Sequence, residues 1–110
     1  MNVTAKPWGQ EEILETNEHY TVKRITMNAG HQCSLQKHIE KKETIVLLYG
    51  MMRLIHKGKE RGIFAGGFVT IEPGEVHQMR AVDDIVYLEC STSQLDDVVR
   101  LEDAYGRATQ

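Results

Sequence analysis

The chain has 110 residues, of which 41% are hydrophobic and 26% are charged. That length supplies enough apolar surface for a single compact domain, residues 1–110, and too little for two. The net charge of −3 argues against a nucleic-acid partner. No apolar run reaches the roughly 18 residues of a membrane span. Residues 1–10 lack the pattern of a secretory signal, so we expect a cytoplasmic protein in which Cys33 and Cys90 are free thiols.

Short runs rich in apolar and β-branched residues alternate with glycine-containing turns along most of the chain. In chain order we expect strands at residues 20–27, 34–38, 43–49, 51–56, 68–71, 76–79 and 85–90. Short strands at this spacing are typical of an all-β sandwich or barrel. Gly50, between two of the longer runs, predicts a tight hairpin, because glycine supplies the positive φ that such a turn needs.

The C-terminal residues differ in pattern from the rest. Val98, Val99, Leu101 and Tyr105 lie among acidic and basic residues. This spacing predicts one or two helical turns, or else an irregular tail, with an apolar side that packs on the barrel.

Four polar side chains could converge on one metal ion. Gln36 and His38 are two residues apart in an expected strand, so both point to the same face. Glu43 follows after a short turn, and His77 lies just beyond Pro73-Gly74. Two imidazoles, one carboxylate and one amide oxygen suit zinc, iron, manganese, cobalt or nickel, and ligand type alone does not choose among them.

Each of these residues also has a simpler interpretation. A single histidine in a strand is usually a surface or hydrogen-bonded core residue, and we interpret His19, His31 and His56 in that way. Glu43 has Lys41 and Lys42 as neighbours and would fit an exposed ion pair. The joint spacing of the four residues distinguishes the metal site from these alternatives.

That spacing resembles the two motifs of the cupin superfamily. Gly30 is followed by five residues, then Gln36-Lys37-His38, four residues, Glu43, six residues and Gly50. Gln36 replaces the first histidine of that motif. Gly67, Pro73-Gly74 and His77 resemble the second motif. The resemblance implies an all-β double-stranded β-helix, a jelly-roll barrel that holds one divalent ion on Gln36, His38, Glu43 and His77.

Further segments resemble the type II phosphomannose isomerase cupin, in which Gln-x-His also replaces His-x-His. These segments are 6–9, 22–25, 34–36 and 99–107. The resemblance implies metal-dependent interconversion of aldose and ketose sugar phosphates, with zinc favoured as the metal. It also implies a sugar phosphate or nucleotide sugar as ligand.

Such a reaction needs a metal to polarise the carbonyl, a base to move a proton, and cations to hold the phosphate. We assign the cationic role to Lys23, Arg100 and Arg107, and Lys23 is an alternative base. Lys23 would otherwise lie on a solvated strand face. The two arginines would otherwise pair with local carboxylates such as Asp103.

The chain departs from that family's pattern at the mouth of the pocket. Lys41 stands where the family usually has arginine, and Thr44-Ile45 where it usually has His-Trp. Two other interpretations therefore stay open: a non-catalytic sugar-binding cupin and an iron-dependent oxygenase. Because sheets with open edges invite pairing, we also expect a homodimer.

Overall fold

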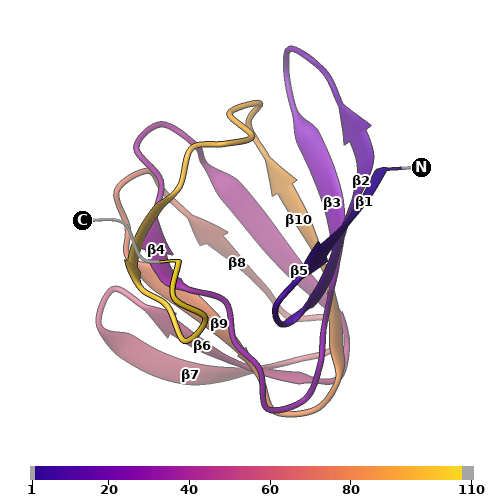
Figure 1. Cartoon of the computed structure of the whole chain (residues 1–110), viewed down its shortest axis with the longest axis vertical. Coiled ribbons are helices and arrows are strands. Elements are labelled where there is room, and N and C mark those ends of the chain that lie inside the picture. The colour runs from indigo at the N-terminus through magenta and orange to yellow at the C-terminus, as the bar shows by residue number, and fades with distance from the viewer. Residues whose placement is uncertain (1, 108–110) are drawn as a thin grey trace.

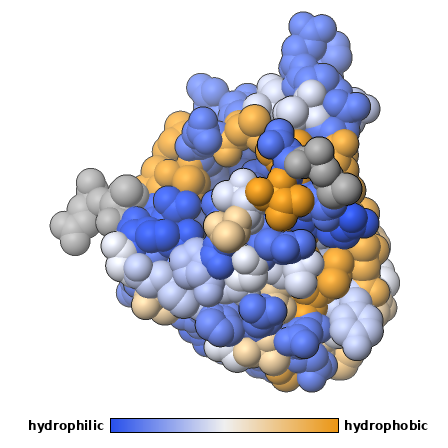
Figure 2. Space-filling view, turned by 45° about the vertical axis from the view of Figure 1, so that its right-hand side comes forward, coloured by the Kyte–Doolittle hydropathy of each residue, from blue (hydrophilic) through white to orange (hydrophobic). Residues whose placement is uncertain are grey.

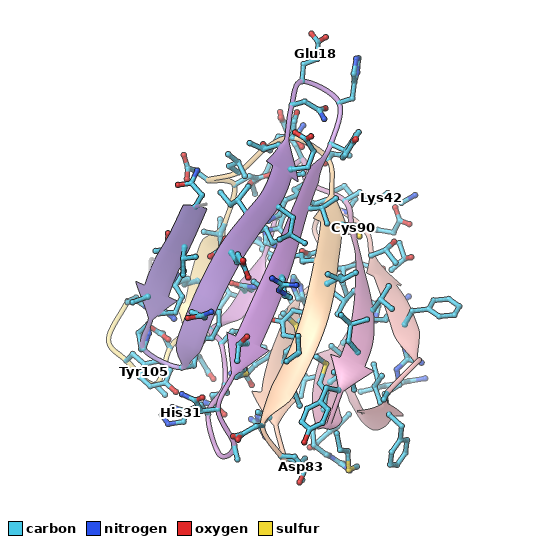
Figure 3. The ribbon with its side chains drawn as sticks, turned by 90° about the vertical axis from the view of Figure 1, so that its right-hand side faces the viewer. Glu18, His31, Lys42, Asp83, Cys90 and Tyr105 are labelled. Carbon is cyan, nitrogen blue, oxygen red and sulfur yellow. The ribbon has the colours of Figure 1, made fainter. Side chains whose placement is uncertain are left out.

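The computed structural model describes residues 2–107, which form two antiparallel sheets packed face to face (Figure 1). The six-stranded sheet has the spatial order β1 (Asn2–Lys6), β2 (Gly9–Thr16), β3 (Thr21–Met27), β10 (Ile85–Ser91), β5 (Glu43–Tyr49) and β8 (Phe68–Ile71). Figure 3 shows this sheet face on. The five-stranded sheet has the order β11 (Val99–Glu102), β4 (Leu35–Lys37), β9 (His77–Ala81), β6 (Met51–His56) and β7 (Lys59–Phe64).

From β3 onward the chain passes back and forth between the two sheets, apart from the β6–β7 hairpin, as a double-stranded β-helix requires, and the all-β prediction is confirmed. Within residues 2–107 the core contains fifteen buried apolar side chains, most of them on the inner faces of the sheets, including Ile25, Leu47, Leu54 and Tyr87. Alternation along β3 is regular, with buried side chains at every second residue from Thr21 to Met27. The described residues contain no helix that could cross a bilayer.

The predicted hairpin at Gly50 is wrong, although the turn is real. Gly50 has φ +81°, but β5 pairs with β8 and β10 whereas β6 pairs with β7 and β9. The turn therefore carries the chain from one sheet to the other. A Cβ at Gly50 would lie 2.3 Å from the carbonyl oxygen of Asp84, so this crossing requires glycine for space as well as for φ.

A two-residue hairpin occurs one strand later, between β6 and β7. Lys57 and Gly58 have φ values of +54° and +75°, and His56 pairs with Lys59. Positive φ at both central residues is the geometry of a type I′ turn. The sequence prediction missed β7 because its first residues, Lys59-Glu60-Arg61, are charged and exposed.

The C-terminal tail is a strand and a loop rather than helical turns. Val99–Glu102 form β11, which pairs with β4. Tyr105 packs against the core, and its hydroxyl lies 2.7 Å from Nδ1 of His31, with the two rings stacked (Figure 3). Leu101 is 41% exposed, so the expected apolar side of the tail is only partly buried. Cross-strand pairing therefore prevailed over the weak helical spacing.

The strands β1 and β2 were also absent from the prediction, because their sequences are polar. Their register places Glu12 opposite Arg24 of β3, where Oε1 of Glu12 lies 2.9 Å from the guanidinium. The connection between β2 and β3, residues 17–20, projects from the body of the molecule and is hydrophilic at its tip (Figure 2).

Candidate metal centre and cavity

Three of the four predicted ligands meet at one point in the interior. His38 directly follows β4, Glu43 begins β5 and His77 begins β9. Their side chains are almost fully buried, with exposed fractions of 3%, 1% and 0%. One ligand atom from each lies within 4.8 Å of the others. Strand ends from both sheets thus bring together residues that are up to 39 positions apart in sequence.

The two imidazoles point their Nε2 atoms at the same carboxylate oxygen. Nε2 of His38 lies 3.0 Å from Oε1 of Glu43, and Nε2 of His77 lies 3.1 Å from it. The ring centroids are 5.0 Å apart. Although burial opposes it, the imidazoles of His38 and His77 hold the pKa of Glu43 well below its ordinary value. Glu43 is therefore present as a carboxylate.

The other nitrogen of each ring faces a backbone carbonyl. Nδ1 of His38 donates to the carbonyl of Asp97 at 2.5 Å, and Nδ1 of His77 donates to that of Glu75 at 3.0 Å. In a neutral imidazole this leaves Nε2 as an acceptor. Metal-bound histidines usually have such a partner on the second nitrogen, because it fixes the tautomer and ring orientation.

Buried acceptors without donors remain in this cluster. Within residues 2–107, Oε2 of Glu43 and Nε2 of His77 have no hydrogen-bond partner. Leaving such atoms unsatisfied is costly. Because both Nδ1 atoms donate to carbonyls, only a protonated ring could also donate from Nε2 to Glu43, and two neutral rings would direct two acceptors at the carboxylate. A divalent cation resolves both problems, so the described side chains fit a metal ion at this point.

Gln36 approaches the same place from β4. It is the cross-strand partner of His77 and lines the cavity described below. Its side-chain oxygen accepts a hydrogen bond from Oγ of Ser34 at 2.9 Å. That contact orients the amide oxygen without using both of its lone pairs.

A cavity of about 590 Å³ opens beside this cluster. Its lining includes residues of β1, β2 and β3 and residues of the C-terminal part of the chain between Leu95 and Arg107. His38 and Gln36 reach its surface, together with apolar side chains such as Trp8, Tyr87 and Leu95. Its charged lining comprises five cations and three carboxylates: Lys6, Lys23, Lys41, Arg100, Arg107, Glu11, Glu89 and Asp96. The volume is in the usual range for a small-molecule site.

The predicted cation Lys23 lies on the cavity wall rather than on a solvated face. Its ammonium forms an ion pair with Glu11, and Glu89 is its cross-strand neighbour on β10. Burial lowers the pKa of Lys23, but Glu89 and Glu11 outweigh this, so the pKa lies above its ordinary value. Lys23 is therefore a fixed positive charge.

The two arginines of the tail reach the cavity in different ways. Arg100 lies on β11 as the cross-strand partner of Gln36. Arg107 forms a double contact with Asp103, at 2.8 Å from Nε and 3.1 Å from the terminal nitrogen. Its guanidinium also lies 5.8 Å from the ring centroid of Tyr105. Arg107 thus has the local carboxylate partner that the sequence offered as an alternative.

Glu89 is a site residue that the sequence reasoning missed. It lies two residues after Tyr87 on the inward face of β10, and Nζ of Lys41 is 3.5 Å from its Oε1. Burial and the negative charge of Glu43 raise the pKa of Glu89 to about 8. The available signal was a carboxylate in phase with buried residues of an apolar strand.

Comparison with known proteins agrees with this description. The family described as "Mannose-6-phosphate isomerase C-terminal" matches residues 2–103. The chain is 33% identical over 107 residues to the mannose-1-phosphate guanylyltransferase ManC of Salmonella typhimurium, covering 93% of this chain and 22% of that protein. It is 30% identical over 108 residues to the xanthan biosynthesis protein XanB of Xanthomonas campestris, covering 93% and 23%. The chain thus spans less than a quarter of the length of these relatives.

Solved structures show the same fold at low sequence identity. KdgF from a Halomonas species superposes with a TM-score of 0.81 at 13% identity, covering 87% of this chain and 89% of that one. An RmlC-like cupin from Shewanella frigidimarina gives 0.80 at 12% identity, covering 86% of each chain. Fold and sequence agree: the chain is a cupin that belongs to the mannose-6-phosphate isomerase C-terminal family.

Proposed function

We propose that the protein is a metal-dependent isomerase that interconverts aldose and ketose forms of a sugar phosphate. The observation that carries this proposal is the buried His38, Glu43 and His77 cluster beside a cavity rich in cations. Membership of the family supports the same chemistry. A phosphorylated sugar suits a site in which polar and charged groups line most of the wall.

The proposed metal is one divalent ion held by His38, Glu43, His77 and Gln36. Imidazole, carboxylate and amide ligands favour zinc, with iron, manganese, cobalt and nickel as alternatives. When bound, the ion would polarise the sugar carbonyl and its neighbouring hydroxyl. A fourth protein ligand at Gln36 leaves less room for oxygen, which disfavours an oxygenase.

The residues around the metal have separate tasks in this proposal. Lys23, Arg100 and Arg107 hold the phosphate, with the guanidinium groups suited to paired hydrogen bonds to its oxygens. Because the pKa of Lys23 is raised, we assign proton acceptance to Glu89 instead. Glu89 takes the proton from C2 of the aldose and returns it to C1, while the proton of the C2 hydroxyl passes to the C1 oxygen, so that both protons are accounted for. Trp8 and Leu95 restrict the access of water.

A metal analysis followed by a coupled assay tests the proposal. The purified protein is loaded with zinc, cobalt or manganese and assayed with mannose 6-phosphate, glucose 6-phosphate and fructose 6-phosphate. Isomerisation that chelation abolishes supports it. If the protein binds a sugar phosphate but none of its metal forms isomerises it, the isomerase proposal is contradicted and the non-catalytic interpretation is favoured. Oxygen uptake by an iron form would favour the oxygenase.

We further propose a homodimer formed through the outer face of the six-stranded sheet. Leu48, Tyr49 and Phe68 are 48%, 64% and 71% exposed on or beside β5 and β8. Exposed apolar side chains on neighbouring strands are typical of subunit interfaces, and a two-fold axis would let the same face cover itself. Solution scattering at micromolar concentration should give the mass of two chains. A monomer mass would contradict the dimer, and Phe68→Glu should produce that mass.

A further inference from the structure

The four backbone amides between His38 and Glu43 all donate to side chains of the segment that joins β10 to β11. Oδ1 of Asp97 accepts from the amide of Ile39 at 2.9 Å. Oδ2 of the same carboxylate accepts from the amides of Glu40 at 2.7 Å and Lys41 at 2.9 Å. The next amide, that of Lys42, donates to Oγ1 of Thr92 at 3.1 Å. Residues 39–42, which connect His38 to Glu43, are therefore held by side chains that lie outside this loop.

Asp97 contacts the site a second time through its main chain. Its carbonyl oxygen is the acceptor for Nδ1 of His38, at 2.5 Å. The carboxylate fixes the position of residues 39–41, and the carbonyl fixes the ring of His38. Because both groups belong to a single residue, a displacement of Asp97 would change the ring orientation and the loop together.

The same segment also borders the cavity. Leu95, Asp96 and Val98 line it, on either side of Asp97. Asp97 is tied down by three charge-assisted hydrogen bonds, which are roughly twice as strong as neutral ones. The neighbouring residue Asp96 is exposed and lines the cavity. The two adjacent aspartates thus have different surroundings.

We propose that Asp97 is a positioning residue of the metal site, which orients His38 and sets the distance from His38 to Glu43. This inference rests on the proposed metal site but not on the proposed isomerase activity. Outer partners of metal-bound histidines usually change metal affinity by about 10–100-fold when they are removed. Asp97 differs from the usual outer partner because it acts on a ligand ring and on the connecting backbone at once.

The test is Co²⁺ titration of the full chain, followed by its visible absorption spectrum, which depends on ligand geometry. Asp97→Ala keeps the carbonyl that faces His38 but removes the carboxylate that holds residues 39–41, so it should weaken Co²⁺ binding by about 10-fold, the low end of the range for outer partners, and alter the spectrum. Asp97→Asn should do so less because one acceptor oxygen remains. Amide hydrogen exchange of the metal-free protein should become faster at residues 39–42 in both variants.

Asp84→Asn is the matched control. Its carboxylate also accepts from a backbone amide, that of Ala29 at 2.8 Å, but among residues outside the metal cluster. It should lower the melting temperature slightly, with unchanged Co²⁺ affinity and spectrum. Thr92→Val removes the bond from the amide of Lys42 and the bond that Oγ1 donates to Oε1 of Gln94, and it leaves the three bonds to Asp97 in place. It should weaken binding in the same direction by a smaller factor, which keeps the inference testable should Asp97→Ala not fold.

The outcomes separate the inference from the proposal beneath it. If the wild-type chain binds no Co²⁺, the metal site fails and this inference fails with it. If the wild-type chain binds Co²⁺ and the folded Asp97 variants bind it within twofold with the same spectrum, only the inference is overturned. In that case Asp97 is a cap for the backbone alone.

Discussion

The inward face of the six-stranded sheet changes character halfway along its strands. On β10, Ile85 and Tyr87 are 0% and 1% exposed and belong to the apolar core. Two residues further, the next inward side chain is Glu89, beside the metal cluster. On β3 the same step leads from Ile25 to Lys23. One sheet face is thus half core and half site, and the boundary crosses neighbouring strands at the same level.

This comparison shows how the fold accommodates buried charge. Isolated charges are expensive to bury, so the polar half must pair its groups, and Lys23 lies between Glu11 and Glu89. The apolar half has no such requirement and provides the burial that stabilises the sheet. We therefore expect substitutions in the two halves to have separable effects, on binding in one half and on stability in the other.

The largest effect should follow from removing both imidazoles, which come from the five-stranded sheet and meet Glu43 of the polar half. The double variant His38→Ala, His77→Ala should lose all stoichiometric divalent metal, because one carboxylate and one amide remain as ligands. Metal content by mass spectrometry after dialysis measures this. His19→Ala, whose ring is 80% exposed, is the control and should retain metal. If the double variant retained its full metal content, the metal site could not be this cluster.

The next largest effect belongs to the apolar half. Leu47→Ala removes a side chain that is 0% exposed and should lower the free energy of unfolding by about 2–5 kcal/mol. Urea denaturation measures it, with Leu14→Ala, which is 45% exposed, as the control with a change within about 0.5 kcal/mol. Metal affinity of the folded protein should stay the same. A large loss of affinity in Leu47→Ala would mean that the two halves are not separable.

A third substitution tests whether the tail belongs to the polar half. Arg107→Ala should weaken sugar-phosphate affinity by about 1.5–3 kcal/mol, the range for a hydrogen bond to a charged group. Isothermal titration below the melting temperature measures this. Asp103→Asn, which removes the charge that Arg107 contacts, should lower the melting temperature but preserve affinity.

The opposite pattern would exclude Arg107 from the site. If Arg107→Ala lowers the melting temperature as much as Asp103→Asn does and leaves affinity unchanged, the ion pair only ties down the tail. The remaining cations of the cavity would then have to bind the phosphate.

The parts of the molecule that could be predicted are those with a local signal. Strands such as β5 and β10 are apolar and bounded by turns, and His38, Glu43 and His77 follow a fixed motif spacing. The polar strands β1, β2 and β7 lack that signal, because edge strands and hairpins need few apolar residues. Their place is fixed by pairing with distant segments, which one sequence does not reveal.

The lack of a local signal also explains which site residues could not be predicted. Asp97 acts on residues 39–41, more than fifty positions away, and a lone aspartate in a tail carries no local sign of that contact. Glu89 did carry a sign, since it is in phase with buried neighbours, but it belongs to no motif segment. The tail was expected to form helical turns or an irregular segment because residues 98–105 contain spaced apolar residues, whereas residues 99–102 pair with the edge of β4.

The smallest predicted effect is a pH dependence that arises where the two halves meet. Burial and the charge of Glu43 raise the pKa of Glu89 to about 8 in the metal-free protein, from an ordinary 4.5. The folded state therefore holds a proton that the unfolded state releases. This contribution to stability is fully present below about pH 4.5 and is lost as the pH rises toward 8.

In chelator, the melting temperature of the wild type should fall across this window more steeply than that of Glu89→Gln, which carries no titrating group at this position. Added zinc should flatten the wild-type slope, because a nearby cation favours the ionised carboxylate. Equal slopes in chelator for the two proteins would show that Glu89 titrates normally, and the polar half would then bury a further negative charge beside Lys23 and Lys41.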